Sequence, residues 1–503
     1  MPSTELTPQL QRVNEEIKRH AHEYGLDFFD VIFEMIDYKQ INEFASLGGF
    51  PTRYPHWRFG MDYDRLTKSY QYGLHKIYEM VINNDPCYAY LLRANNMVDQ
   101  KLVMAHVYAH CDFFKCNMYF EGTNRKMMDE MANHATRIRN YMDRFGVTLV
   151  EDFIDACLSI ENLIDYHHAN AERLYKPVDQ ELDEDDVDTE SEPLRVPKLK
   201  SKNYMDKFIN PESFIKQQLN KLLKQKEHSK KFPPDDEKDV LLFLQEYAPL
   251  KNWQRDVLSI IREESYYFSP QGQTKIMNEG WASYWHSKIM TQKALMDSEV
   301  IDFADHHSGT MHMRPGTLNP YKLGLELFKD IEDRWNKGMF GKEWDECNDF
   351  RVKKNWDKKT GLGRQKIFEV RKLHSDVTFI DTFLTQEFAE KFKLFVFEEN
   401  KKTGQWEIAS REFKKIKDKL LFQLTNFGQP FISVHDANFK NRSELLLAHR
   451  HEGFDLKVSE AHRTLESVFK IWRRTVNIKT IVQGEGRLLT YDGKDHTESS
   501  FDK

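Results

Sequence analysis

The sequence predicts a mainly α-helical protein, with a large N-terminal helical domain and a smaller α+β domain at the C-terminus. Apolar residues recur at helical spacing through most of the chain before about residue 375. After that point short β-like runs begin, separated by turn residues. The length of 503 residues also exceeds that of one ordinary domain, so we expect two or three domains.

The N-terminal helical domain is predicted in two parts, residues 1–176 and 237–374. Apolar spacing predicts helix over residues 8–45 and an almost wholly helical block over 64–176, with a loop rich in glycine, proline and aromatic residues between them. The second part begins with further helices and includes a helix near 321–337.

Residues 177–236 have a different composition from the rest of the chain. Glu181 to Glu192 contains eight acidic residues in twelve, and Lys198 to Lys231 contains ten lysines. Such segments bury too little apolar surface to offset the entropy of ordering. We therefore expect a charged, disordered insertion, which serves either as a solvated linker or as a docking arm for a partner.

The C-terminal α+β domain is predicted over residues 375–503. Residues 392–410 have the pattern strand–turn–strand, with a turn that contains glycine, and further β-like runs lie at 430–435, 444–449 and 478–491. We found no internal repeat along the chain.

Composition excludes several classes of function. The net charge of −7 and the pI near 6.3 argue against a nucleic-acid partner, because such binders are basic. The five cysteines include no CxxC pair, which fits a reducing compartment. The N-terminus has no signal-peptide pattern, and no apolar run is long enough for a membrane span. We therefore expect a soluble, cytoplasmic protein.

Two histidine-bearing stretches predict a metal site. His106 and His110 are four residues apart, so a helix places them on one face. Glu279 and His286 are seven residues apart and share a face for the same reason. Two imidazoles and the Glu279 carboxylate suit zinc, or alternatively iron. The other interpretation is a packed core in which Glu279 pairs with an arginine and the histidines hydrogen-bond to neighbours.

Helical zinc peptidases carry a glutamate directly after the first histidine, whereas this chain has Val107. A water-activating base must then come from elsewhere, and Glu263 or Glu264 are the candidates. Asp112, two residues after the second histidine, is a further candidate for this role or for contact with substrate. His286 is expected either as a fourth ligand or as a proton shuttle.

The loop Phe50–Gly60 supplies candidate substrate-binding residues, because guanidinium, imidazole and indole groups suit carboxylates, sugars and phosphates. The alternative is that this loop braces the helices. The candidates are Arg53, His56 and Trp57. Three more histidines are expected in another loop, at His306, His307 and His312.

Long motifs in this chain resemble those of the SpoVR family, that of the stage V sporulation protein R. The matching segments include Gly49-Phe-Pro-Thr-Arg-Tyr-Pro-His-Trp-Arg-Phe-Gly60, Leu74 to Tyr90, Ala105-His-Val-Tyr-Ala-His-Cys-Asp-Phe-Phe-Lys115, Lys275-Ile-Met-Asn-Glu-Gly-Trp-Ala-Ser-Tyr-Trp-His286, Asn319 to Gly324 and Gly363 to Val370. The resemblance runs from about residue 8 to 493, interrupted by the charged insertion. It implies a role in forming the spore cortex, a specialised peptidoglycan. It also implies a wider stress role, with a serine-kinase-like protein as partner.

The residues and the resemblance together favour a metal-dependent hydrolase that acts on amide bonds of a peptidoglycan-related or peptide substrate. In this hypothesis zinc is held by His106, His110 and Glu279. Two alternatives remain open. One is a non-catalytic regulatory or scaffold protein with a structural metal, and the other is a non-haem iron redox enzyme.

Overall fold

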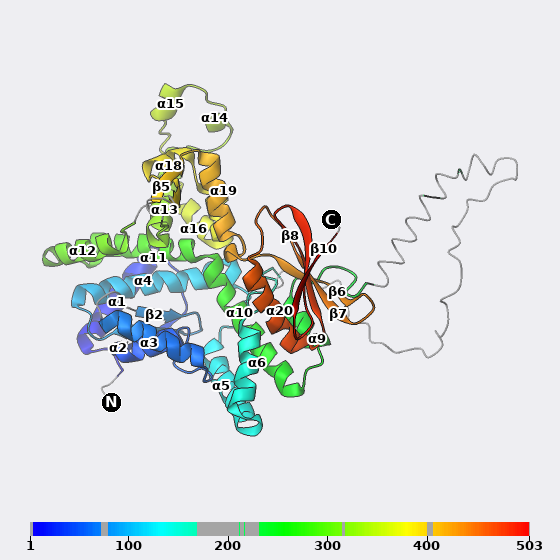
Figure 1. The fold of residues 1–503 in the computed structure, drawn as a ribbon. Helices are drawn as coiled ribbons and strands as arrows, with labels where there is room; N and C mark the ends of the chain where they lie inside the picture. The colour runs from blue at the N-terminus through cyan, green and yellow to red at the C-terminus, as the bar shows by residue number, and fades with distance from the viewer. Residues whose placement is uncertain are drawn as a thin grey trace, which may run out of the picture. The chain divides into compact units, whose positions relative to one another are not determined.

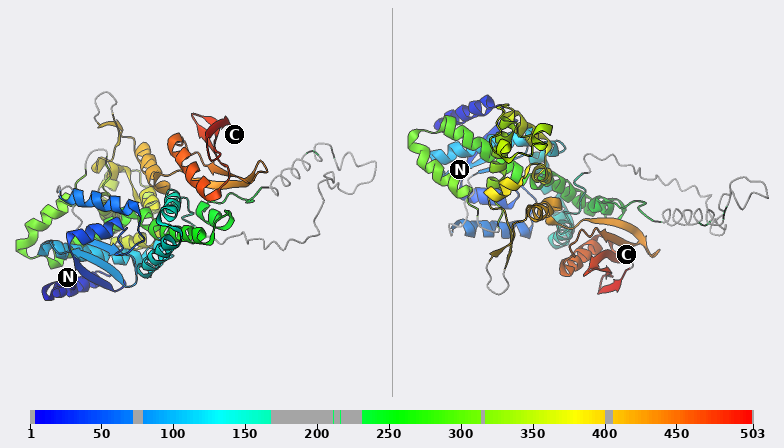
Figure 2. Two further views of the ribbon diagram at one scale, coloured as in Figure 1. Left: turned by 60° about the horizontal axis from the view of Figure 1, so that its bottom comes forward. Right: turned by 90° about the horizontal axis from the view of Figure 1, so that it is seen from above.

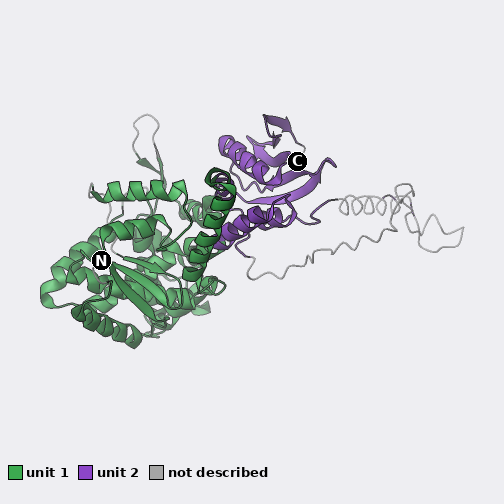
Figure 3. Cartoon of the chain, turned by 90° about the horizontal axis from the view of Figure 1, so that it is seen from below, with its two compact units in different colours: residues 1–151, 266–429 green, residues 152–265, 430–503 purple. Residues whose placement is uncertain are grey.

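The computed structural model describes residues 4–71, 79–167, 211, 216, 231–313, 317–399 and 406–501 (Figures 1 and 2). Almost all of the predicted charged insertion, residues 177–236, lies outside the described residues. The chain divides into two compact units, and each is formed by two separate segments (Figure 3). Unit 1 comprises Met1–Glu151 and Tyr266–Gln429, and unit 2 comprises Asp152–Ser265 and Pro430–Lys503. These boundaries differ from the predicted ones, because residues 152–265 group with the C-terminal strands and residues 375–429 group with the N-terminal segment.

Three packed helices of unit 1 carry the predicted site. They are α4 (Met97–Cys116), α11 (Lys275–Ile289) and α13 (Pro320–Lys337). α4 is buried along almost its whole length, so its side chains meet neighbours on every face. α11 lies against α13 where Gly280 faces Gly324, and a Cβ atom added at Gly280 would lie 2.4 Å from the Gly324 backbone. Only glycine permits this approach.

The start of α11 is held by a carboxyl group from another helix, α17 (Asp376–Phe383). The backbone N–H groups of Ile276 and Met277 donate hydrogen bonds to Asp376 over 2.8 and 2.9 Å. The first N–H groups of a helix have no partner within the helix, so they need such an acceptor. Burial raises the pKa of Asp376 to about 7, although these two hydrogen bonds act to lower it. Asp376 therefore fixes the end of the helix that carries Glu279.

A three-stranded sheet interrupts the helices that the sequence predicts in this unit. β3 (Cys87–Leu92) lies between β1 (Val31–Ile36), which is parallel to it, and β2 (Glu79–Ile82), which is antiparallel. The prediction of helix is therefore wrong over these three segments. β1 is rich in β-branched and apolar residues, and its hydrogen-bonding partner lies more than fifty residues away in the sequence. Local periodicity contains no information about such a partner.

The structure confirms the predicted strand–turn–strand at β4 and β5 and the predicted helix near 321–337. The prediction of a loop is wrong at His306 and His307, which lie on helix α12. The other elements of the segments that form unit 1 are α1 (Pro8–Glu23), α2 (Tyr38–Ser46), α3 (Trp57–Gln71), η1 (Met118–Phe120), α5 (Met127–Phe145), η3 (Met290–Ala294), η4 (Asp297–Glu299), α12 (Val300–Thr310), α14 (Lys342–Asp345), α15 (Phe350–Lys354), α16 (Gly363–Leu373), α18 (Gln386–Lys391), β4 (Val396–Glu399), β5 (Trp406–Ser410), α19 (Phe413–Leu424) and η5 (Thr425–Gly428).

Unit 2 contains a five-stranded sheet in the order β10-β9-β8-β7-β6. α20 connects β7 to the parallel strand β8 and buries Leu465, Val468 and Ile471. This sheet confirms the predicted smaller α+β part. The elements of this unit, including two helices that cross its boundary, are α6 (Val147–Leu158), α9 (Val240–Tyr247), α10 (Asn252–Gln273), β6 (Ile432–Phe439), β7 (Glu444–His449), α20 (Val458–Trp472), β8 (Val476–Val482), β9 (Glu485–Tyr491) and β10 (His496–Ser500). Throughout the described part of the chain, every helix is too short or too polar to cross a bilayer.

Candidate metal centre

The structure brings together the two histidines and the glutamate that the sequence predicts as ligands. His106 and His110 point from one face of α4 towards Glu279 on α11. The Oε2 atom of Glu279 lies 3.6 Å from Nε2 of His106 and 3.5 Å from Nε2 of His110. The three potential ligand atoms all lie within 4.8 Å of one another. Both histidines are buried, and Glu279 is nearly so.

The spacing of these atoms fits a shared cation better than direct hydrogen bonds. Hydrogen bonds from imidazole to carboxylate are about 2.7–2.9 Å long, and those seen here exceed that length. Two ligands of a tetrahedral zinc, each about 2.1 Å from the ion, are roughly 3.4 Å apart. In addition, Oε2 of Glu279 is buried and has no hydrogen-bond partner among the residues that the structure describes. A buried, unpartnered carboxylate oxygen is costly, and a metal ion would satisfy it.

Neighbouring groups orient both imidazole rings. Nδ1 of His110 lies 2.8 Å from Oδ1 of Asn278, which can only accept, so Nδ1 carries the proton and the lone pair of Nε2 is directed towards Glu279. Nδ1 of His106 lies 2.8 Å from Nδ1 of His286, and Nε2 of His286 lies 3.2 Å from Nδ1 of His307. Both nitrogens of His286 are therefore engaged by other histidines. As the side chains lie, His286 is a neighbour of the site rather than a fourth ligand.

The pKa shifts of His106 and Glu279 suit metal binding, whereas the shift of His110 favours a protonated ring, whose proton a metal ion would have to displace. Burial, followed by the charge of His110, lowers the pKa of His106 to about 4, so this ring is neutral. Burial alone would lower the pKa of His110, but its interaction with Glu279 raises it. Burial likewise opposes ionisation of Glu279, yet the two histidines hold its pKa well below the usual range. A carboxylate and a neutral imidazole are the forms that bind metal ions.

Two further residues beside the triad had not been predicted from the sequence. Glu79 on β2 is partly buried, and its environment raises its pKa to about 7. Burial is the main cause, Glu279 adds to it, and His110 opposes it. Tyr321, at the start of α13, stacks on His106 with ring centroids 6.2 Å apart. Burial and the charges of Glu279 and Glu79 raise the pKa of Tyr321 above its usual range. Both residues lie within segments that resemble the SpoVR family, and this resemblance was the signal in the sequence that could have identified them.

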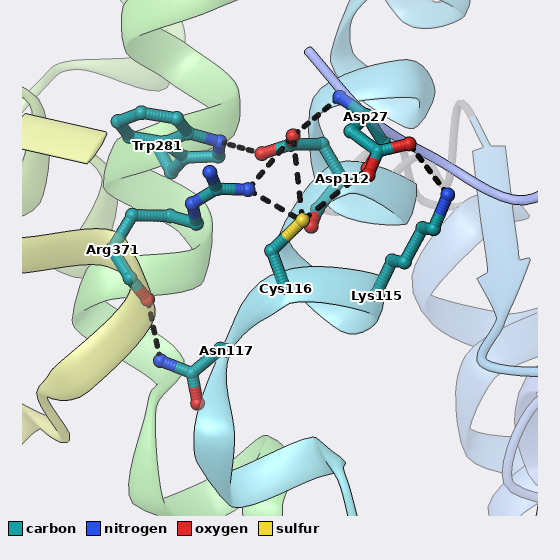
Figure 4. Close-up of polar contacts among 7 residues, drawn as sticks. All are labelled: Asp27, Asp112, Lys115, Cys116, Asn117, Trp281 and Arg371. Atoms are coloured by element: carbon teal, nitrogen blue, oxygen red, sulfur yellow. Dashed lines mark hydrogen bonds and ion pairs between the residues drawn. The ribbon is translucent and has the colours of Figure 1, made fainter. Parts of the chain in front are cut away.

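Asp112 lies inside the core between α4, α11 and α16 (Figure 4). Its carboxylate accepts hydrogen bonds from the indole N–H of Trp281 at 2.7 Å, from Arg371 at 2.8 Å and from the backbone N–H of Asp27 at 2.8 Å. It follows His110 by two residues, so the helix turns it away from the histidine face. This placement fits a role in joining α4 to α11 and leaves no surface for the predicted contact with a substrate.

The remaining predicted residues are Arg53, His56 and Trp57 of unit 1 and Glu263 and Glu264 of unit 2. The Arg53 guanidinium lies over the Phe59 ring at 4.6 Å, His56 is buried, and Trp57 is about half exposed. Their role in substrate binding stays a prediction. Glu263 and Glu264 belong to unit 2, where the former is exposed and the latter buried, and their role as a base also stays a prediction.

Comparison with known proteins identifies the family. No solved structure matches the chain. The uncharacterized protein YcgB of Escherichia coli (strain K12) is 28% identical over 472 residues, which cover 86% of this chain and 84% of that protein. A sequence profile of the family described as SpoVR like protein matches residues 4–429, a range that contains the whole triad. The chain therefore belongs to the SpoVR like protein family.

Proposed function

We propose that this protein is a metal-dependent hydrolase of amide bonds, with zinc held by His106, His110 and Glu279. The observation that carries the proposal is the buried, unpartnered oxygen of Glu279 beside two imidazole nitrogens. Zinc at this position would act as a Lewis acid on a substrate carbonyl and lower the pKa of a bound water. Three protein ligands leave one position open, as catalytic sites require and closed structural sites do not.

The neighbouring residues can supply the other catalytic roles. Glu79 is a carboxyl group beside the triad that can take a proton from the attacking water, which replaces the glutamate missing at Val107. Tyr321 can donate its hydroxyl proton in a hydrogen bond to the oxygen on which negative charge develops. His286 and His307 hold the ring of His106 in position.

Family membership supports the choice of substrate class. The proposed substrates are peptides or peptidoglycan-related stem peptides, which fits the resemblance to proteins of spore cortex formation. A cytoplasmic enzyme of this kind would act on wall precursors or turnover peptides. A serine-kinase-like partner and a role in stress are part of the same proposal. The net charge of −7 argues against a nucleic-acid substrate.

The same donor set favours one second candidate, a non-haem iron enzyme. Two histidines and one carboxylate with open positions also suit Fe(II). A scaffold protein with a structural metal receives less support, because His286 is engaged elsewhere and does not close the site. The identity of the bound metal separates the first two candidates.

The first test is the metal content of protein purified without chelator or nickel, measured by elemental mass spectrometry. We expect close to one zinc per chain in the wild type and its loss in His106→Ala and in Glu279→Gln. His312→Ala is the matched control, because His312 is an exposed histidine of the same unit. Stoichiometric iron would select the redox enzyme. Folded wild-type protein that binds neither metal would refute the metal centre.

The second test is hydrolysis of peptidoglycan stem peptides, followed by mass spectrometry of new amino termini. We expect zinc-dependent cleavage that is absent in His106→Ala. Removal of a general base costs roughly 10²–10⁴ in rate, so Glu79→Gln should fall into this range. Glu263→Gln and Glu264→Gln should keep wild-type rates. Unchanged rates in Glu79→Gln together with a loss of rate in Glu263→Gln or Glu264→Gln would contradict the assignment of the base to Glu79.

A further inference from the structure

A separate cavity of about 700 Å³ lies in unit 1, between α19, the β4–β5 hairpin and the residues that precede α13 (Figure 1 shows these elements). Its walls are mostly apolar and include Phe395, Phe397, Trp406 and Leu420. Trp406 is 59% exposed, although it is a large apolar side chain. The volume falls within the range of about 300–1,000 Å³ that is typical of small-molecule sites. No member of the metal triad lines it.

The charged residues among the described ones that line this cavity are all positive. They are Lys322, Lys393 and Lys419, and no described aspartate or glutamate is among the lining residues. The ammonium group of Lys419 donates a hydrogen bond to the backbone oxygen of Phe397 at 3.1 Å, which places it at the hairpin. None of the three lysines forms an ion pair with any described residue. Three cations beside an apolar wall would attract an anion that also carries apolar surface.

Lys393 adds an independent observation. It has a φ of +53°, in the left-handed region, directly after the end of α18. The N–H of Leu394 bonds to the oxygen of Ala389 and that of Lys393 to the oxygen of Glu390, which is the Schellman arrangement of a helix end. Glycine is the favoured residue at this position, because a side chain is strained there. A lysine at a strained position beside a ligand-sized cavity points to a role for its charge.

We infer that the cavity binds a single-chain amphiphilic anion, whose apolar chain lies against the aromatic wall and whose anionic head meets the three lysines. The occupant is a monomer free in solution rather than a bilayer surface, because a hollow of about 700 Å³ accommodates a single chain and not a flat face. This inference goes beyond the proposed function. Lys322 directly follows Tyr321 in the sequence, but the two residues serve different sites.

The test uses cis-parinaric acid, a fluorescent 18-carbon carboxylate, titrated into the full-length protein. Binding is read as energy transfer from tryptophan, and the contribution of Trp406 is isolated with Trp406→Phe. We expect saturable binding of one molecule per chain, and binding of its methyl ester that is about tenfold weaker. Lys393→Gly should weaken binding of the acid about tenfold and keep the melting temperature, because glycine relieves the strained φ.

Three controls make the result decisive. Lys329→Gln, on α13 away from the cavity, should bind as the wild type does. Thr317→Trp, which places a large ring at the cavity wall, should abolish binding. His106→Ala should keep it, so that failure of the metal centre and failure of this inference are distinguishable. Equal affinity for acid and ester, unchanged binding by Lys393→Gly, or binding only to phosphatidylglycerol vesicles would each overturn the inference.

Discussion

Asp112 joins the metal-bearing helix α4 to its neighbours through three hydrogen bonds to its carboxylate. Its buried carboxylate faces the Arg371 guanidinium and two N–H donors. Asp112→Ala would leave the guanidinium buried without its counter-charge, so we expect the free energy of unfolding to fall by about 3–5 kcal/mol. Urea denaturation measures this change. Asp27→Asn is the control, because its side chain is exposed in the same network and its loss should cost under about 1 kcal/mol. Equal losses would contradict the assigned role.

Glu79 predicts a pH dependence of stability in the metal-free protein. Its folded pKa of about 7 lies above the ordinary value of 4.5, so the native state binds more protons than the unfolded state between these values. The free energy of unfolding should therefore decrease as the pH rises from about 4.5 to about 7. The glutamine of Glu79→Gln cannot titrate. The decrease in the free energy of unfolding should therefore be smaller in this variant than in the wild type, by on the order of 2–3 kcal/mol. The measurement is denaturation with chelator at pH 5 and pH 8. Parallel decreases in both proteins would contradict the assignment.

The contact between α11 and α13 is expected to be the most sensitive helix pair near the metal centre. A Cβ atom added at Gly324 would lie 2.1 Å from the backbone oxygen of Ile276, so Gly324→Ala must push the two helices apart. Because Glu279 and Tyr321 lie on these helices, we expect a loss of about 2 kcal/mol or more in stability and weaker zinc binding. Calorimetric titration with zinc measures the second effect. Gly309→Ala, on α12, is the matched control, because a Cβ atom added at Gly309 would have no neighbouring atom within 4 Å. Equal zinc affinity in both variants would refute the coupling.

The elements that the sequence predicts best are those whose evidence is local. The four-residue spacing of His106 and His110 predicts a shared helix face, and the structure has them so. Glu279 was predicted as a ligand from the unusual composition around it. The sequence could not predict that Glu279 lies close to α4, because that distance is set by the packing of the two helices. Glu79 was missed because β2 is defined by pairing with β3, which helical periodicity does not report. Asp112 was predicted near a substrate from its position in the sequence, although the helix turns it into the core.

At the scale of the whole molecule, the candidate chemistry is concentrated in one unit. The metal triad, Glu79, Tyr321 and the amphiphile cavity all belong to unit 1. The matched family range ends at residue 429, where unit 1 also ends, so the sheet strands of unit 2 lie outside it. Each unit nevertheless buries apolar residues of its own, which is what independent folding requires.

This division predicts two transitions in scanning calorimetry, of which only one responds to zinc. A ligand stabilises the part of a protein that binds it, by about 2.7 kcal/mol at a hundredfold excess over its dissociation constant. For a unit of this size we expect an increase of on the order of 5 °C in the midpoint of the unit 1 transition. The midpoint of unit 2 should stay constant, and His106→Ala should remove the increase. Because the triad is formed within a single unit, an equal shift of both transitions on adding zinc would mean that the units unfold together, and no shift in either would mean that the triad binds no zinc.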